Sequence, residues 1–346
     1  MKGAERSQFV ISMLDRYKAV TMESLMALLP DKEPRRYLYD LVPLYPLRSG
    51  KGLRPGLCIA TCCAFGGSVR SVLQSAVAIE LFHNAFLVHD DVEDGSLNRR
   101  GHPTLAFEYG LPIAVNVGDA MNVLSIHPLM ENLNQLGPTL TWRVFTEIEH
   151  MVNECVEGQA MELGWVHDNI CDLNDDSYLR MILKKTCWYT CIQPCRIGAL
   201  VGSGGSADLD RFNRFGYFMG AAFQIQDDLL NLVGEEAKYG KEIGGDIWEG
   251  KRTLVLIHTW NHCNAREKKH LQGFLATPRI DRSPADVLWV YEIMGKYKSM
   301  EYARENARQL AGAALKEYTV AYGDLADSEE KRFIADIVLY MIERDL

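Results

Sequence analysis

Apolar residues recur every three to four positions along most of this chain, and this spacing predicts a series of helices. Alternation typical of strands is scarce, and glycine-containing stretches separate the helical segments. Several segments are longer and more apolar than a surface helix requires, so the predicted fold is one all-α domain, a multi-helix bundle around a central cavity. The expected helices cover residues 6–29, 35–48, 54–65, 69–94, 111–134, 138–162, 175–202, 207–233, 251–262, 265–275, 283–297, 299–321 and 327–344, within a single domain spanning residues 1–346.

The most informative of these helices ends in a cluster of acidic residues that is followed by Gly95. Asp90 and Asp94 lie four residues apart on one helical face, and Asp91 lies beside them. Carboxylates at a helix C-terminus are unfavourable because they face the negative end of the helix dipole. A positive ligand should offset this charge, and an oxygen-only ligand set favours Mg²⁺ over zinc.

A second apolar helix, near residues 217–233, repeats this arrangement in its last turns. Asp227 and Asp228 are adjacent there, and Asn231 places an amide oxygen four residues after Asp227. Two paired acidic motifs on separate helices can converge on one cavity. The repetition therefore strengthens the prediction of a metal site.

Basic residues suited to holding an anion occur near both acidic motifs and in an earlier turn. Lys51 and Arg54 lie in a glycine-containing turn before an apolar helix, where arginine can bind phosphate through two N–H groups. Each basic residue alone would more often belong to a weak surface ion pair. Together with the acidic motifs they indicate a diphosphate held by metal ions and cationic side chains. The other basic residues of this kind are Arg99, Arg100, Lys185, Lys241 and Lys251.

Composition narrows the possible partners and location of the protein. The net charge of −9 argues against nucleic acid as the main partner. The first residues lack the apolar core of a signal peptide, and no apolar run reaches the length of a membrane helix. Nine cysteines, an odd number, indicate a reducing cytoplasmic location without a disulfide framework. Cys187, Cys191 and Cys195 form one helical stripe, which fits tetrahedral metal binding poorly and indicates small core residues.

This ordered set of motifs resembles the head-to-tail trans-isoprenyl diphosphate synthases, especially geranylgeranyl and farnesyl diphosphate synthases. A lone DDxxD motif would be weak evidence, but the whole set in this order is specific. The resemblance implies an isoprenoid synthase-type bundle, acting as a homodimer with Mg²⁺, that condenses isopentenyl diphosphate with an allylic prenyl diphosphate. The matching segments lie within residues 35–255 and are 51–55, 90–94, 99–100, 185–186, 223–228 and 241–251.

The resemblance also implies a role for each matching residue. Metal ligands would be Asp90, Asp91, Asp94, Asp227 and Asp228. Residues holding the allylic diphosphate would be Arg99, Lys185, Lys241 and Lys251. Residues holding isopentenyl diphosphate would be Lys51, Arg54, His83 and Arg100. The catalytic residues Thr186 and Gln224 would present oxygens toward a developing allylic cation, with Phe223 packing nearby.

Three positions depart from the family pattern without removing a required ligand. Asn231 stands where many members have a third aspartate, and its amide oxygen is expected to support the site through water. Glu162 replaces a common aspartate, and Cys187 occupies a position often held by glycine. These differences leave room for a specialised member of the family.

Aromatic residues below the first acidic motif indicate a short product. Phe86 and Phe82 lie about 6 Å and 12 Å from Asp90 along much the same helical face. A growing prenyl chain would meet these rings, while Ala85 would leave one side open. A single aromatic residue one turn below the motif favours a C15 or C20 product, and C20 is slightly preferred. An equally good interpretation is that both rings simply pack in the core.

Two other functions remain open from the sequence. A terpene cyclase of the same fold would ionise a prenyl diphosphate without condensing it, but it has no need for a second diphosphate site. A non-catalytic subunit of a heteromeric synthase would be expected to lose metal ligands, whereas both acidic motifs are intact here.

Overall fold

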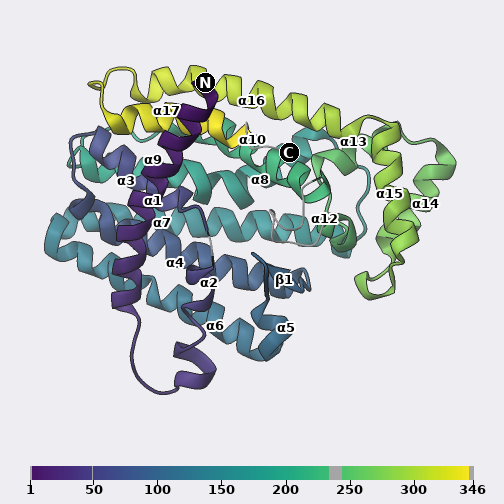
Figure 1. Cartoon of the computed structure of the whole chain (residues 1–346), viewed down its shortest axis with the longest axis horizontal. Coiled ribbons are helices and arrows are strands. Elements are labelled where there is room, and N and C mark those ends of the chain that lie inside the picture. Colours follow the sequence, from purple (N-terminus) through teal and green to yellow (C-terminus); the bar gives the residue numbers. More distant parts are fainter. Residues whose placement is uncertain (1, 49, 234–243, 343–346) are drawn as a thin grey trace.

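The protein is a bundle of long helices arranged around α4 and α7, as Figure 1 shows. The computed structural model describes residues 2–48, 50–233 and 244–342, so the predicted substrate-binding residue Lys241 lies outside the described residues. Strands in these ranges are limited to the short antiparallel hairpin β1 (Asn98–Arg99) and β2 (His102–Pro103). The predicted all-α class is therefore confirmed.

The N-terminal half builds one side of the bundle and the first acidic helix. Its elements are α1 (Lys2–Leu28), η1 (Arg35–Tyr39), α2 (Leu44–Leu47), α3 (Leu53–Ala64), α4 (Val69–Glu93), β1, β2, α5 (Leu105–Tyr109), α6 (Leu111–Leu124) and α7 (Ile126–His167).

Two predicted helices in this half are wrong as single elements. The segment 35–48 divides into η1 and α2, because Pro43 lacks an N–H and cannot continue a helix. The segment 111–134 divides between α6 and α7, since Pro128 cannot donate to the carbonyl of Leu124. A kink inside α7 at Gly137, with φ 73°, matches the predicted start of a helix at residue 138.

The C-terminal half supplies the second acidic helix and closes the bundle. Its elements are α8 (Asp175–Ile182), η2 (Leu183–Ile192), α9 (Gln193–Gly202), α10 (Arg211–Val233), α12 (Gly245–Glu249), α13 (Leu254–His262), α14 (Ala265–Ala276), η3 (Arg279–Asp281), α15 (Pro284–Lys296), α16 (Ser299–Tyr322) and α17 (Glu329–Ile342). The predicted helix 175–202 is continuous, but its middle, η2, is π-helical. Such segments are rare and often mark functional sites.

The helix α4 is the centre of the core. It packs against α3, α6 and α7, and Ser68 and Ser71 close its N-terminus with a reciprocal capping box. Among the described helices, α4 is the one that is long and apolar enough to cross a membrane, and its apolar window is 72% buried by other helices. That burial identifies α4 as the core helix of the bundle.

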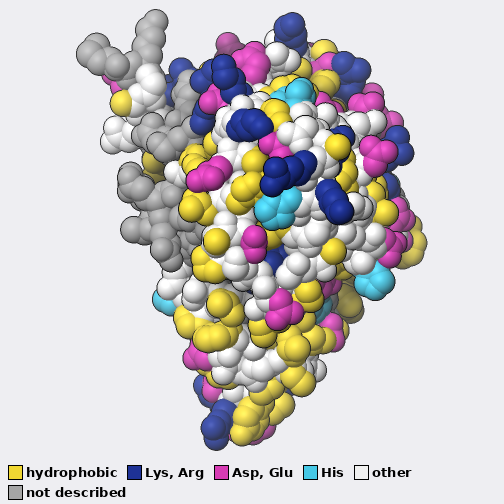
Figure 2. All heavy atoms as spheres, turned by 90° about the vertical axis from the view of Figure 1, so that its right-hand side faces the viewer, with side chains coloured by type: hydrophobic (Ala, Val, Ile, Leu, Met, Phe, Trp, Pro, Cys, Tyr) yellow, Lys and Arg dark blue, Asp and Glu magenta, His cyan; other side chains and the backbone are white. Residues whose placement is uncertain are grey.

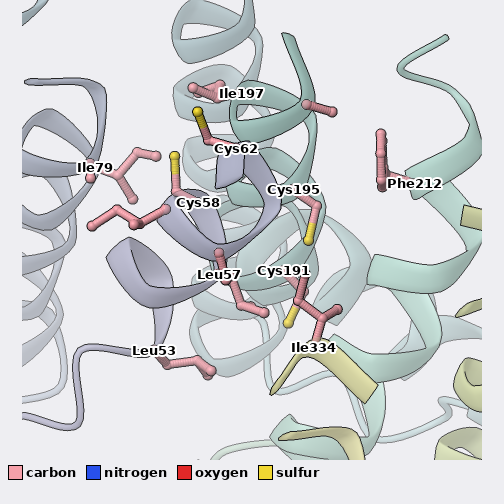
Figure 3. Close-up of a cluster of buried hydrophobic side chains, with 14 of the residues drawn as sticks. Leu53, Leu57, Cys58, Cys62, Ile79, Cys191, Cys195, Ile197, Phe212 and Ile334 are labelled. Carbon is pink, nitrogen blue, oxygen red and sulfur yellow. The ribbon is translucent and has the colours of Figure 1, made fainter. Parts of the chain in front are cut away.

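Cys187, Cys191 and Cys195 are buried core residues, as predicted. Figure 3 shows Cys58 and Cys62 of α3 near Cys191 and Cys195, which come from η2 and α9, among aliphatic side chains. All four are fully buried, and burial raises the pKa of the Cys195 thiol to about 11. These thiols therefore fill space between helices and remain protonated.

The helices α14 and α15 form an arm at one end of the bundle (Figure 1). This end faces the viewer in Figure 2, where lysine, arginine and histidine side chains gather over the upper half. The arm returns to the bundle through Arg279, which donates to Glu249 Oε1 at 3.0 Å. The C-terminal arm thus contacts α12 through Glu249.

Two glycines allow η2 to lie unusually close to its neighbours. A Cβ atom at Gly158 of α7 would lie 2.2 Å from the backbone nitrogen of Lys185, and one at Gly220 of α10 would lie 2.9 Å from Cα of Cys187. Because both contacts involve backbone atoms, a larger residue would push η2 away. The glycines therefore fix the position of Lys185 and Thr186.

We predict that Gly158→Ala lowers the free energy of unfolding by about 1–3 kcal/mol, because the added methyl group overpacks the contact with η2. The measurement is chemical denaturation followed by circular dichroism. Gly164→Ala is the matched control, since a Cβ at this position of the same helix meets nothing within 4 Å. Alanine has the higher helix propensity, so the control should stabilise the protein slightly. Equal effects of the two changes would contradict the account.

Candidate functional site

A cavity of about 550 Å³ lies between the two acidic helices, and it gathers most of the predicted site residues. Its walls come from α4, α7, η2, α10 and the segment that precedes α13. The predicted residues that line it are Arg54, His83, Phe86, Asp90, Arg99, Arg100, Lys185, Thr186, Phe223, Gln224, Asp227, Asp228 and Lys251. Segments up to 200 residues apart are thereby brought to one place.

The carboxylates of the first acidic motif are held by three cations. Asp90 accepts from Lys185 Nζ at 3.2 Å and from Arg99 Nη2 at 3.0 Å. Asp94 accepts from Lys251 Nζ at 2.5 Å, although it does not line the cavity as described. The residues predicted to bind metal and those predicted to bind diphosphate therefore compensate one another's charge in this structure.

Asp91, the second carboxylate of the first acidic motif, is not among the residues that line the cavity. Its carboxylate is fully buried behind the cavity wall, where Oδ1 accepts from Arg99 Nε at 2.8 Å and Oδ2 accepts from Tyr45 at 2.5 Å. With both oxygens bonded, Asp91 holds the Arg99 guanidinium as a buried counter-ion in this structure. Its role as a direct metal ligand stays a prediction.

Both aspartates of the second acidic motif, Asp227 and Asp228, line the cavity. The inner residue, Asp228, accepts from Tyr178 at 2.7 Å and from Gln224 Nε2 at 2.7 Å. Thr186 in turn donates to Gln224 Oε1 at 2.9 Å, so the two predicted oxygen-bearing residues lie together.

Asn231 does not lie on the cavity wall within the described part of the chain. Its side chain is buried, and Oδ1 accepts from the backbone N–H of Asp246 at 3.0 Å. The amide therefore anchors the first turn of α12 to α10. Support of the metal site by Asn231 through water stays a prediction.

A separate basic cluster occupies the other side of the cavity. Cζ of Arg54 lies 4.2 Å from the centroid of the Tyr189 ring. Its Nη2 donates to Thr190 Oγ1 at 2.8 Å, and its Nη1 lies 3.2 Å from His83 Nε2. Burial, followed by the charges of Arg54 and Arg100, lowers the pKa of His83 well below its ordinary value. His83 is therefore neutral and adds no positive charge. Lys51 lies nearby in sequence but outside the cavity lining, with its ammonium 5.9 Å from the Tyr340 ring centroid.

Unpaired nitrogen atoms make this cluster suitable for an anion. Within the described residues, Arg54 Nε and His83 Nδ1 are buried without a hydrogen-bond partner. A buried polar group without a partner is costly, and a phosphate oxygen would satisfy such a donor. The cluster can therefore hold a second phosphate-bearing group, apart from the acidic motifs.

The three residues predicted to set product length are placed unequally. Phe86 lines the cavity, and Phe82 stacks behind it with ring centroids 6.3 Å apart. Ala85 is fully buried in a different cluster that includes Leu105 and Val117. Ala85 is not among the lining residues of the described cavity, and its influence on product length stays a prediction.

The donor set fits a hard divalent cation. Among the described residues no group of three or more His, Cys, Asp or Glu side chains has converged as a metal site, since the carboxylates turn toward Arg99, Lys185 and Lys251. Burial raises the pKa of Asp94 and that of Asp228 to about 7, so their charged forms are poorly stabilised by the protein alone. A divalent cation between the two motifs would supply the missing positive charge.

Sequence reasoning missed several residues that complete the site. Tyr178 lies seven residues before Lys185, and this two-turn spacing is a signal that could have identified it. Tyr45 and Glu249 had no such local signal. Glu249 accepts from Ser96 Oγ, 153 residues away, at 3.0 Å and pairs with nearby Lys251 at 2.9 Å.

Comparison with known proteins agrees with the fold and the site. The sequence model of the polyprenyl synthetase family matches residues 36–294. A geranylgeranyl diphosphate synthase of Saccharolobus solfataricus is 31% identical over 77% of this chain and 78% of its own length.

Two solved structures share the architecture. Geranylgeranyl pyrophosphate synthetase from Pyrococcus horikoshii superposes with a TM-score of 0.83 at 30% identity, covering 96% of this chain and 99% of its own. Geranylgeranyl pyrophosphate synthase from Corynebacterium glutamicum, complexed with isoprenyl diphosphate and magnesium, gives a TM-score of 0.80 at 23% identity and covers 99% of both chains. The latter likeness shows the fold alone.

An all-α bundle with two acidic motifs facing one cavity defines a prenyl-transferring enzyme of the isoprenoid synthase class. The chain belongs to the polyprenyl synthetase family. It is a short-chain prenyltransferase, and neither a terpene cyclase nor a non-catalytic subunit is favoured.

We predict different consequences for the two kinds of aspartate. Asp227→Asn should lower turnover about a hundredfold or more with little change in Tm, because this side chain faces the cavity. Asp91→Asn should lower Tm markedly as well as turnover, since it removes the buried charge that pairs with Arg99. The expected loss in the free energy of unfolding is about 3 kcal/mol or more. Turnover and thermal unfolding of both variants provide the measurement. A lower Tm for Asp227→Asn than for Asp91→Asn would contradict these assignments.

Proposed function

We propose that this chain condenses isopentenyl diphosphate head-to-tail with an allylic diphosphate and forms mainly geranylgeranyl diphosphate, C20. The observation that carries this proposal is that two clusters of residues suited to binding phosphate line one cavity. One contains Asp90 and Asp227 with nearby cations, and the other contains Arg54 and Arg100. A synthase needs both clusters, whereas a cyclase needs only the first.

The first cluster would bind the allylic diphosphate. Asp90, Asp94, Asp227 and Asp228 supply oxygens that would hold Mg²⁺. Mg²⁺ would neutralise the negative charge that develops on the diphosphate as the allylic C–O bond breaks. The cationic side chains Arg99, Lys185 and Lys251 are already positioned by carboxylates, so they can exchange those partners for phosphate oxygens. Lys241, which lies outside the described residues, is proposed to join them.

The second cluster would bind isopentenyl diphosphate. The side chains of Arg54, His83 and Arg100 line the cavity, and Lys51 would reach the diphosphate from the adjacent turn. Burial lowers the pKa of Arg100, so an anionic ligand there is favourable. Holding both substrates in one cavity converts their reaction into an effectively intramolecular step.

The wall between the clusters would protect the allylic cation. Thr186 and Gln224 place oxygens beside it, and Phe223 contributes a ring face. Water must be excluded because it would quench the cation. After the isopentenyl double bond attacks, the departing diphosphate accepts the proton, since no cavity side chain stands out as a base among those described.

The proposed C20 length rests on the ring pair below the first acidic motif. Phe86 lines the cavity with Phe82 behind it, and Tyr189 packs edge-on against Phe86 at 5.8 Å. These rings leave room for a short prenyl chain and block a long one. The names of the relatives at about 30% identity agree with this length.

We also propose that the enzyme is a cytoplasmic homodimer with one domain per chain. Exposed apolar side chains, spaced at helical intervals on α6 and the first part of α7, support a self-association surface. Among them are Val115, Val123, Met130, Leu133 and Trp142. The packing of α16 on α10 and of α17 on α3 supports a single domain.

The direct test supplies the purified protein with Mg²⁺, isopentenyl diphosphate and dimethylallyl, geranyl or farnesyl diphosphate in turn. Chain elongation to a C20 diphosphate, identified by chromatography, is the expected result. Formation of hydrocarbons from the allylic substrate alone would instead indicate a cyclase. Absence of any turnover would refute the proposed function.

We predict that Phe86→Ala shifts the products toward longer chains, because it removes the ring that closes the cavity below Asp90. The matched control is Phe107→Ala, since Phe107 is 64% exposed on α5 and does not line the described cavity. Chromatography of the dephosphorylated products provides the measurement. An unchanged distribution of product lengths for Phe86→Ala would show that Phe86 does not close the cavity below Asp90.

A further inference from the structure

The two acidic motifs share an arrangement that the family motifs do not describe. In each motif the second aspartate accepts a hydrogen bond from a buried tyrosine on another element. Its other oxygen accepts from a residue that faces the cavity. The two chains of contacts are Tyr45–Asp91–Arg99 and Tyr178–Asp228–Gln224.

The first chain of contacts crosses from α2 to the hairpin. Tyr45 is 1% exposed and donates to Asp91 Oδ2 at 2.5 Å. Asp91 Oδ1 accepts from Arg99 Nε at 2.8 Å, while Arg99 Nη2 reaches Asp90 at 3.0 Å. The tyrosine therefore limits rotation of the carboxylate that orients the guanidinium.

The second chain of contacts crosses from α8 to α10. Tyr178 is 1% exposed and donates to Asp228 Oδ2 at 2.7 Å. Asp228 Oδ1 accepts from Gln224 Nε2 at 2.7 Å. This bond fixes which end of the Gln224 amide is the nitrogen, so Oε1 must turn toward Thr186.

We propose that Tyr45 and Tyr178 are positioning residues that orient Arg99 and Gln224 through the inner aspartates of the two motifs. The proposal rests on the proposed function, since it assigns Arg99 to the diphosphate and Gln224 to the allylic cation. Groups that are oriented before reaction stabilise charge without reorganisation during the step. Both tyrosines are buried, and each hydroxyl donates to a carboxylate oxygen.

The two tyrosines should differ in their kinetic effect because they act on different groups. Arg99 would bind the diphosphate in the ground state, so loss of the Tyr45 hydroxyl should weaken ligand binding. Gln224 would act mainly as the cation forms, so loss of the Tyr178 hydroxyl should lower kcat with little change in KM. If the two tyrosines had only a structural role, their loss would lower stability without affecting ligand binding in one variant and kcat in the other.

The experiment compares Tyr45→Phe, Tyr178→Phe and Tyr302→Phe with the unmodified protein. Tyr302 of α16 also donates to a carboxylate, that of Asp175, but it does not line the cavity and serves as the matched control. Binding of inorganic pyrophosphate with Mg²⁺ is measured by calorimetry, Tm by circular dichroism, and kcat and KM by elongation.

We expect Tyr45→Phe to weaken pyrophosphate binding about tenfold. Tyr178→Phe should leave that binding within about twofold and lower kcat about tenfold. Tyr302→Phe should change neither. If both site variants match the Tyr302→Phe control, the proposal is overturned.

The experiment distinguishes failure of the positioning role from failure of the proposed function. Failure of the unmodified protein to elongate would refute that function, while the calorimetry would still test Tyr45. If Tyr45→Phe does not fold, Tyr178→Phe alone tests the proposal, which predicts a lower kcat with little change in KM.

Discussion

Two buried helices end with their carboxylates facing one cavity, and this concentration of like charge constrains everything around it. Without nearby cations, the charged forms would be disfavoured both by burial and by mutual repulsion. Three cationic side chains pair with the first acidic motif: Arg99 from the hairpin, Lys185 from η2 and Lys251 from the segment before α13. Each comes from a different element, so the charge balance also fixes how those elements meet.

The same constraint explains the close packing around the site. Lys185 can reach Asp90 only because η2 lies against α7 at Gly158, where a side chain would collide with its backbone. Lys185 also pairs with Glu162 of α7, the residue that replaces a common family aspartate. Ion pairs that are stable without ligand thus prepare a site in which phosphate and metal can replace protein partners.

Much of this site was predictable because the residues that carry its chemistry occur in short local motifs. Asp90 and Asp227 stand in adjacent acidic pairs at the ends of apolar helices, and the structure places both on the cavity wall. What sequence could not give was the direction of each side chain. Asp91 turns inward to Tyr45, 46 residues away, and Ala85 faces a different cluster because one residue along a helix rotates the side chain by about 100°.

The central claim is that one cavity holds two diphosphates in separate clusters. A crystal structure with Mg²⁺, isopentenyl diphosphate and an unreactive thio-analogue of geranyl diphosphate tests it most directly. The account predicts metal ions between Asp90 and Asp227 with the allylic analogue, and isopentenyl diphosphate at Arg54 and Arg100. Both diphosphates bound at the acidic motifs, or an empty basic cluster at saturating isopentenyl diphosphate, would contradict it.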